Sequence, residues 1–314
     1  MSTGQASDEG SQSTDILQLA LSLERLDKDL FRSVMLYTPR GARGTFGGQL
    51  VAHALVAAQE TIDDVSNRRV HSLHSNFLTP GVSTEHIYYR VRRVRDGKTF
   101  ATRTVSAFQN GEMVYVANVS FHAKEAAGLA HATQLPSDAP TVEAAVSEYD
   151  LLANFVRDAK GDQIKDNLRR KMAQQTSILI RYGLYGSMKA PVVSDVGYAW
   201  IKAQHFDAVT DVKLHRALAF FVSDFTLALS PVLPHGFPNR NLAMLVSLDH
   251  TVYFHDDFNV GDWFLYETRS HWANHNRGLA MGRVYTRDGG RLVMTVIQEA
   301  LVRMEKGFTS VAKL

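Results

Sequence analysis

Two segments of this 314-residue chain are apolar on nearly every side, and they limit its fold more than any other feature. Residues 49–62 (QLVAHALVAAQETI) and 218–229 (LAFFVSDFTLAL) each predict a helix with almost no polar face. Such a helix is stable in water only when other elements cover it from all directions. The pair Gly47–Gly48 precedes the first helix and indicates a close approach to another part of the chain, because glycine has no side chain to obstruct one.

Each apolar helix is accompanied by segments typical of an antiparallel β-meander. Short β-rich runs end at Asn-Gly, Asp-Gly or Asp-Gly-Gly, which are strong signals for hairpin turns. The motif His74-Ser-Asn-Phe77 is echoed by His250-Thr-Val-Tyr253 in the second half. The repeated order of signals predicts a duplicated α+β unit. The expected strands are 71–78, 87–94, 99–108 and 113–122 in the first copy, and 198–203, 245–255, 263–271, 278–286 and 292–303 in the second.

The duplication divides the chain into five parts. Residues 1–14 are rich in Ser, Thr and Gly and predict a disordered arm. The first unit is expected at 15–132 and the second at 196–305. Between them, 133–195 is expected to be a linker followed by a charged, helical insert, and 306–314 a tail.

Composition excludes several classes of chemistry. The chain has no cysteine, which rules out disulfides, thiolate metal sites and a cysteine nucleophile. Its 34 Lys and Arg residues are scattered and nearly balanced by 32 Asp and Glu, so we expect no nucleic-acid partner. No apolar run reaches the roughly 18 residues of a membrane span. The paired histidines lie in strand or turn segments without the spacing of a helical metal site, so we expect neither metal nor cofactor. These pairs are His71 and His74, His250 and His255, and His271 and His275.

Three polar residues interrupt hydrophobic elements of the second unit. Asp224 lies inside the apolar helix, where an unpaired carboxylate would cost several kcal/mol or stay protonated. Ser247 interrupts the run LVSLDH, and Gln298 interrupts VMTVIQEALV, where alternation places it on one face with Val296 and Ala300. Each alone has an ordinary structural explanation. Together they form a candidate site in which a carboxylate orients or deprotonates a water molecule.

The first unit lacks an equivalent set of residues. Its helix offers Gln49 and His53, but no carboxylate before Glu60. If the two units are equivalent, we expect chemistry only in the second, while the first keeps the shape.

Several of these motifs together resemble the type II acyl-CoA thioesterases, the TesB family. The resemblance implies a double hotdog fold, in which each of two antiparallel sheets wraps around a long helix. The matching motifs are RGTFGGQLVAHALVA (43–57), HSLHSNFLTPG (71–81), SDF (223–225), LDHTVYFH (248–255) and GRVYTRDGGRLVMTVIQEALVR (282–303).

The resemblance also implies a reaction and its catalytic residues. Asp224, Ser247 and Gln298 would hold and polarise a water that hydrolyses fatty acyl-CoA to free fatty acid and CoA, with Ser247 as a water ligand and not a nucleophile. Two alternatives remain open. A hotdog enoyl-CoA hydratase would need a histidine a few residues from Asp224, but the next one is His235. A non-catalytic acyl-CoA binding protein would have the tunnel without the polar set.

The ending Ala312-Lys313-Leu314 is one step from the Ser-Lys-Leu peroxisomal address. We therefore expect a peroxisomal import receptor as a partner and a location in the peroxisomal matrix. With this ending, the chain is most similar to peroxisomal members of the family. The resemblance further implies a homo-oligomer, a dimer or tetramer, because hotdog proteins usually associate through their sheets.

Overall fold

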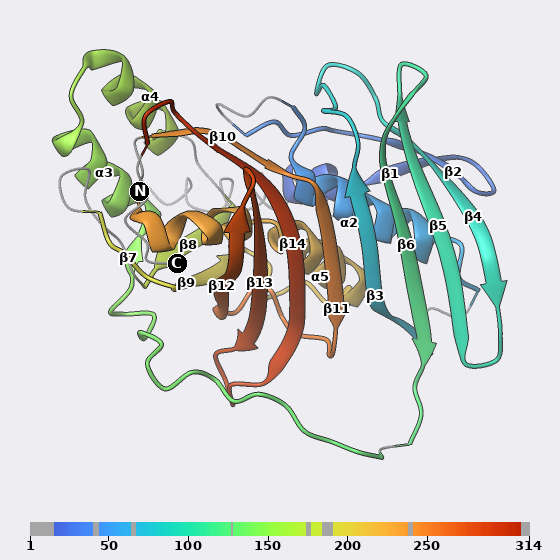
Figure 1. The fold of residues 1–314 in the computed structure, drawn as a ribbon. Helices are drawn as coiled ribbons and strands as arrows, with labels where there is room; N and C mark the ends of the chain where they lie inside the picture. The colour runs from blue at the N-terminus through green and yellow to red at the C-terminus, as the bar shows by residue number, and fades with distance from the viewer. Residues whose placement is uncertain are drawn as a thin grey trace, which may run out of the picture.

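Two adjacent helices lie against one face of a curved antiparallel sheet (Figure 1). They are α2 (Gly47–Gln59) and α5 (Val212–Val222), and both fall on the apolar segments that predict buried helices. The expected arm 1–14 and the tripeptide 312–314 lie outside the described residues. The computed structural model describes residues 16–39, 44–63, 67–126, 128–173, 177–183, 191–237 and 241–308.

The sheet consists of two halves that repeat the same arrangement. The strand order is β1-β2-β4-β5-β6-β3 in the first half and β11-β14-β13-β12-β9-β8-β7 in the second, and the halves join where β3 pairs with β11. A further strand, β10, also pairs with β14. The first half comprises β1 (Leu23–Asp27), β2 (Leu30–Ser33), β3 (Arg68–Phe77), β4 (Tyr88–Asp96), β5 (Phe100–Gln109) and β6 (Glu112–Ala123). The second comprises β7 (Val146–Ser147), β8 (Ile178–Tyr182), β9 (Val196–Ala203), β10 (Leu242–Ser247), β11 (Asp249–Phe254), β12 (Phe264–Asn274), β13 (Arg277–Thr286) and β14 (Leu292–Met304).

The sequence echo between His74 and His250 is not a structural equivalence. Across the β3–β11 pair, His250 lies opposite Ser75, and His74 lies opposite Thr251. Because successive side chains of a strand point to opposite faces, this offset of one residue reverses their directions. His250 is fully buried, whereas His74 is exposed. The echo of the motif His74-Ser-Asn-Phe77 therefore does not place the two histidines in matching surroundings, although the helix and meander occur twice.

The second apolar helix ends earlier than expected. After α5, residues 223–226 form a turn that leads into a 3₁₀ helix, η1 (Leu227–His235). Thr226 has a φ of 62°, in the left-handed region, where a right-handed α-helix cannot continue. The expectation of one continuous helix through Leu229 is wrong. As a result, Asp224 lies in a turn directly after the helix and not within it.

The expected strand 245–255 is two strands. Ser247 is the last residue of β10 and Asp249 the first residue of β11, and the two strands pair with successive parts of β14. At the break, the Leu248 N–H donates to the carbonyl oxygen of Glu299 over 2.9 Å. Ser247 is thereby fixed beside β14 at the point where one strand gives way to the next.

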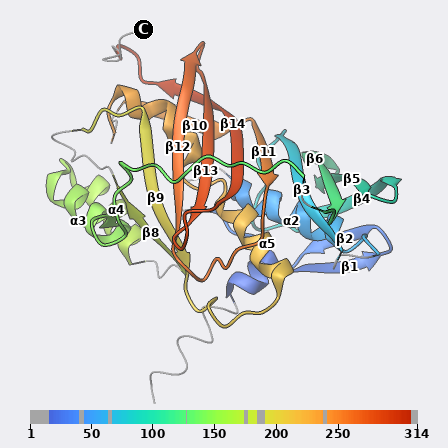
Figure 2. The same cartoon turned by 90° about the horizontal axis from the view of Figure 1, so that it is seen from below.

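The segment between the two units covers the outer face of the second half-sheet. The charged insert forms the expected helices, α3 (Glu148–Asp158) and α4 (Asp162–Met172). Before them, an extended chain crosses the sheet (Figure 2). Trp200 Nε1 donates to the carbonyl oxygen of Pro140 over 2.8 Å, and several apolar side chains of this segment pack on β9 and β12. Part of the second half-sheet, at β9 and β12, is therefore covered on both faces.

Residues Val212–His235 are long and apolar enough to cross a membrane by composition alone. Most of this stretch is buried inside the protein, and it is broken by the turn after α5. These features are those of a core segment that the sheet covers.

The two central helices run antiparallel and approach most closely at a glycine. A Cβ placed on Gly48, in the first turn of α2, would lie 2.1 Å from the carbonyl oxygen of Phe221, near the end of α5. At the other end of the pair, Lys213 Nζ lies 3.4 Å from a carboxylate oxygen of Glu60. The close approach that the Gly47–Gly48 pair predicts is thus between the two copies of the duplicated unit.

Gly48→Ala should destabilise the whole protein. The added methyl would meet backbone, which cannot rotate away, so we expect the free energy of unfolding to fall by roughly 2 kcal/mol or more. Thermal unfolding followed by circular dichroism measures this. Gly128→Ala is the control, because a Cβ there would meet nothing within 4 Å. Equal melting temperatures for the two variants would contradict this account of the helix contact.

Candidate active site

The structure brings the three predicted site residues together. Ser247 Oγ donates to Asp224 Oδ1 over 3.3 Å, and Gln298 Nε2 donates to Ser247 Oγ over 2.7 Å. They come from three elements: the turn after α5, the end of β10 and the middle of β14. A carboxylate, a hydroxyl and an amide that are far apart in the sequence therefore share one small volume.

Gln298 occupies the buried face of β14, as its alternation with Val296 and Ala300 predicts. All three residues are fully buried. A buried amide needs partners for both its NH₂ group and its oxygen. The NH₂ group donates to Ser247, and the oxygen lies 2.5 Å from Nδ1 of His250.

The first copy of the unit contributes to the site through the beginning of α2. The Gly48 N–H donates to the carboxylate of Asp224. A Cβ on the preceding Gly47 would lie only 2.6 Å from Asp224 Oδ2, so glycine is required here for the helix to reach the carboxylate. The N-terminus of a helix carries a partial positive charge, which favours an anionic group placed there.

Burial of the Asp224 carboxyl group raises its pKa to about 6. Removal from water favours the neutral form of an acid. Hydrogen bonds from Gln298, Ser247 and the Gly48 N–H oppose this shift because they favour the carboxylate. The result is an acid that is largely ionised at neutral pH and still basic enough to accept a proton from water.

Two residues of the site are not among those singled out from the sequence. His250 lies between Gln298 and Ser223, and its Nε2 is 2.7 Å from Ser223 Oγ. The signal for His250 is its alternation with Val252 and Phe254 on the buried face of β11. In the sequence, His250 stands out only through the echo of His74 and through its spacing from His255, which lacks the pattern of a helical metal site. His255 lies on the other face, where Nε2 is 2.9 Å from Thr295 Oγ1, so the two imidazoles do not converge.

In the first copy, the corresponding polar residues of the helix hold the chain together. Gln49 donates from Nε2 to the carbonyl oxygens of Ala20 and Met35, over 2.7 and 2.8 Å. His53 Nε2 lies 2.8 Å from the same Ala20 oxygen, and Nδ1 lies 2.9 Å from the hydroxyl of Tyr89. These side chains are fully buried and bind the N-terminal segment to α2. Their hydrogen bonds are all made within the first copy, to the backbone of the N-terminal segment and to Tyr89.

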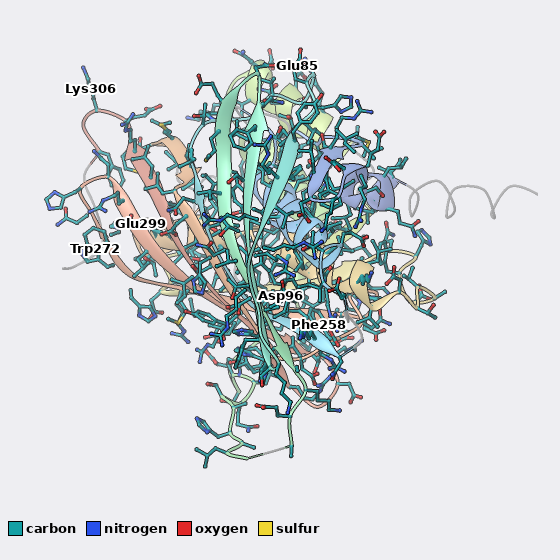
Figure 3. All side chains as sticks on the ribbon, turned by 90° about the vertical axis from the view of Figure 1, so that its right-hand side faces the viewer. Glu85, Asp96, Phe258, Trp272, Glu299 and Lys306 are labelled. Carbon is teal, nitrogen blue, oxygen red and sulfur yellow. The ribbon has the colours of Figure 1, made fainter. Side chains whose placement is uncertain are left out.

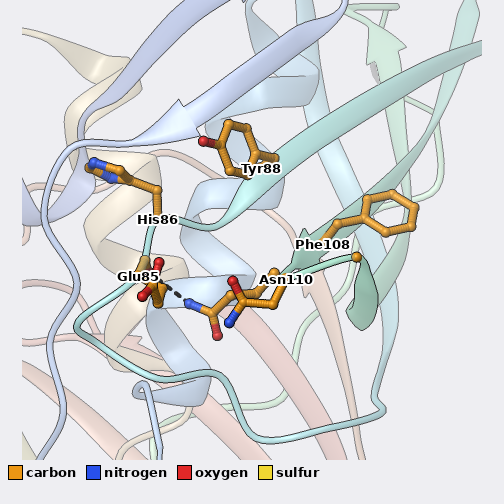
Figure 4. Close-up of a pocket in the computed structure, with 7 residues that line it drawn as sticks. Glu85, His86, Tyr88, Phe108 and Asn110 are labelled. Atoms are coloured by element: carbon orange, nitrogen blue, oxygen red, sulfur yellow. Dashed lines mark hydrogen bonds between the residues drawn. The ribbon is translucent and has the colours of Figure 1, made fainter.

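A surface hollow lies at a different place, away from Asp224, Ser247 and Gln298. It has a volume of 280 Å³ and is lined by residues 85, 86, 88 and 108–111 (Figure 4). Its wall is held by a hydrogen bond from Gln109 Nε2 to the carbonyl oxygen of Glu85. Figure 3 shows Glu85 well separated from Glu299, the neighbour of Gln298. Within the described part of the chain, no cluster of three or more His, Asp or Glu side chains could hold a metal ion.

Two family models match the chain in order. Residues 36–122 match the acyl-CoA thioesterase N-terminal domain, and residues 173–301 match acyl-CoA thioesterase. Mouse acyl-coenzyme A thioesterase 8 is 32% identical to this chain over 292 residues, which cover 91% of this chain and 88% of the mouse protein. The chain belongs to the acyl-CoA thioesterase family. The family resemblance of its motifs is confirmed, and with it the class of enzyme, a thioester hydrolase.

Two further relatives of this acyl-CoA thioesterase support the fold and the family. The crystal structure of an acyl-CoA thioesterase II, TesB2, from Mycobacterium marinum has a TM-score of 0.70 and 28% identity, over 94% of this chain and 99% of that one. The peroxisomal acyl-coenzyme A thioester hydrolase 1 of Saccharomyces cerevisiae is 28% identical, over 84% of this chain and 87% of the yeast protein. The likeness covers both copies of the helix-and-sheet unit, which confirms the double hotdog fold.

Asp224→Asn should stabilise the protein at alkaline pH and not at acid pH. The raised pKa of Asp224 means that the folded state binds its proton more tightly than the unfolded state. Ionisation therefore costs stability above about pH 6, and this cost disappears as the pH falls through 6 towards 4. We expect the variant to gain about 2 kcal/mol at pH 8 and almost nothing at pH 4.

Urea unfolding at the two pH values measures the difference. Asp207→Asn, which removes an exposed carboxylate, is the control and should show no such pH dependence. An Asp224→Asn variant that is no more stable than the wild type at pH 8 would contradict the burial of an ionised carboxylate.

Proposed function

We propose that this protein hydrolyses fatty acyl-CoA to free fatty acid and CoA through a water molecule held by Asp224, Ser247 and Gln298. The observation that carries the proposal is the convergence of these three side chains at the N-terminus of α2, within hydrogen-bond distance of one another. Family membership supports the reaction, and the geometry supports the choice of residues.

The reaction needs a base, and Asp224 has the properties of one. With a pKa of about 6 it is mostly ionised at neutral pH, close to the best value for proton transfer at that pH. It accepts a proton from the water, whose oxygen attacks the thioester carbonyl carbon. The tetrahedral intermediate then breaks its carbon–sulfur bond, and CoA leaves as a thiolate that takes up the proton held by Asp224, so that the carboxylate is restored. The acyl group departs as a carboxylic acid.

Ser247 is better suited to hold water than to attack the substrate itself. Gln298 donates a hydrogen bond to Ser247 Oγ over 2.7 Å and the Ser247 hydroxyl donates to Asp224, so the second lone pair of Oγ is left to accept a hydrogen bond from water. The imidazole of His250 contacts Ser223 and Gln298 and therefore does not activate Ser247. These contacts favour direct hydrolysis without an acyl-enzyme.

Substitution of the three residues separates the proposed roles. Asp224→Asn should lower kcat by at least about 100-fold, because it removes the base. Ser247→Ala and Gln298→Ala should lower kcat less, by roughly 10-fold, since each removes one hydrogen bond to the water. CoA release from palmitoyl-CoA, followed with a thiol reagent, measures all three.

Three results would contradict the proposal. They are full activity of Asp224→Asn, accumulation of an acyl-enzyme during a rapid-quench single turnover, and the absence of CoA release by the wild type across acyl chain lengths. Hydration of crotonyl-CoA in the same preparation would favour the hydratase alternative.

We also propose a peroxisomal location, through recognition of Ala312-Lys313-Leu314 by an import receptor. The name of the yeast relative and the similarity of this tripeptide to Ser-Lys-Leu support this proposal. A homo-oligomer, a dimer or tetramer, is likewise proposed. The side chains of Tyr253, Trp272 and Leu279, on three strands of the second half-sheet, are exposed and available for such contacts.

Deletion of Ala312-Lys313-Leu314 should leave the protein in the cytosol. Fluorescence microscopy of cells that express the chain with an N-terminal fluorescent tag measures its location against a peroxisomal marker. The substitution Ala312→Ser is the matched control and should keep or strengthen import. Peroxisomal fluorescence of the deleted form would contradict recognition of the tripeptide.

A further inference from the structure

The imidazole of His250 is buried between two polar side chains of the second unit. It is fully buried, on the inward face of β11. Its Nδ1 lies 2.5 Å from the amide oxygen of Gln298, and its Nε2 lies 2.7 Å from Ser223 Oγ. Ser223 is itself buried and directly precedes Asp224 in the turn after α5. Of the three residues proposed to hold the water molecule, His250 therefore contacts only Gln298.

The chemistry of the contacts determines which atom carries the proton. An amide oxygen can only accept a hydrogen bond, so Nδ1 of His250 must be the donor to Gln298. Burial lowers the pKa of His250 to about 4, and the ring is neutral at pH 7. A neutral imidazole has one N–H, so Nε2 must accept. The Ser223 hydroxyl has one proton and lies 2.7 Å from two acceptors, the carbonyl oxygen of Phe220 and Nε2, so with this tautomer the proton is shared between them.

These assignments form a chain of hydrogen bonds with one direction. It runs from Ser223 to His250, on to Gln298, then to Ser247 and finally to Asp224. The two ends of a glutamine amide have nearly the same shape, so packing alone does not prevent the amide from turning over. A reversed Gln298 would direct its oxygen at Ser247 and Asp224, where two acceptors would face each other.

We propose that His250 is a positioning residue that fixes the amide of Gln298, so that its NH₂ group always faces Ser247 and Asp224. The contact of Ser223 with Nε2 in turn fixes the tautomer of His250. The proposal rests on the proposed function, because the correctly oriented NH₂ group is what holds the water and favours the ionised form of Asp224. It assigns a role to a histidine that touches neither the water nor the substrate.

Loss of the contact between His250 and Gln298 would change the pKa of Asp224, the proposed base. Gln298 donates to the Asp224 carboxylate and thereby lowers its pKa, so an amide that turns over raises it. The other titratable groups that influence the buried Asp224 carboxyl are the hydroxyls of Tyr115, on β6, and Tyr266, on β12. Burial raises the pKa of both tyrosines well above 10, so they remain neutral. Between pH 5 and pH 8 the acid limb of the rate profile therefore reports Asp224.

Two substitutions of His250, one that removes the hydrogen-bond donor and one that keeps it, test the proposal. His250→Leu removes the donor, and His250→Asn keeps an amide NH₂ close to the position of Nδ1. We expect His250→Leu to lower kcat about 10- to 100-fold through loss of orientation and to move the acid limb of kcat to higher pH. His250→Asn should recover most of kcat and the original acid limb. An unchanged acid limb in His250→Leu, or equal impairment of both variants, would overturn the proposal.

A second measurement does not depend on enzyme activity. In the wild-type protein labelled with ¹⁵N-histidine, the long-range ¹H–¹⁵N spectrum reports the tautomer of each imidazole. The signal of His250, identified by its loss in His250→Asn, should show a neutral ring with the proton on Nδ1 from pH 5 to pH 8. A proton on Nε2, or titration of this ring above pH 5, would overturn the proposal. A correct tautomer in a protein that does not hydrolyse acyl-CoA would contradict the proposed function alone.

Discussion

The contact between the beginning of α2 and the end of α5 is the constraint on which the rest of the structure depends. Gly48 lies so close to Phe221 that no other residue fits, and its N–H reaches the carboxylate of Asp224. One contact therefore joins the two copies of the unit, ends the second helix against the first, and stabilises the charge of the proposed base. The same contact therefore determines both the packing of α2 against α5 and the electrostatic surroundings of Asp224.

The buried polar groups beside the central helices have different partners in the two copies. In the first copy, Gln49 and His53 bind the backbone around Ala20 and Met35, so buried polar groups are satisfied by the chain itself. In the second copy, Asp224 is satisfied by side chains and one N–H at the junction of the copies. A buried carboxylate whose hydrogen bonds only partly offset its burial keeps a raised pKa, which is useful to a base and unfavourable for stability.

Much of the fold follows from patterns that extend over a whole element. The apolar segments identify both helices, hairpin dipeptides identify the meanders, and period-two alternation places Gln298 on the buried face. The missed features depend on single residues and on long-range contacts. The positive φ of Thr226 ends the helix, and a break at Leu248 divides a strand. The three residues of the proposed site stand out in the sequence because each interrupts an apolar run, whereas the contact of His250 with Gln298 depends on how β11 and β14 pair.

The site also crosses the boundary between the two copies. Asp224, Ser247 and Gln298 belong to the second copy, but the N–H of Gly48 that supports the carboxylate belongs to the first. Neither half of the chain contains a complete site, even though each contains a complete helix and meander. The first copy is therefore part of the proposed site through its backbone alone, and separation of the two copies would remove that support from the carboxylate.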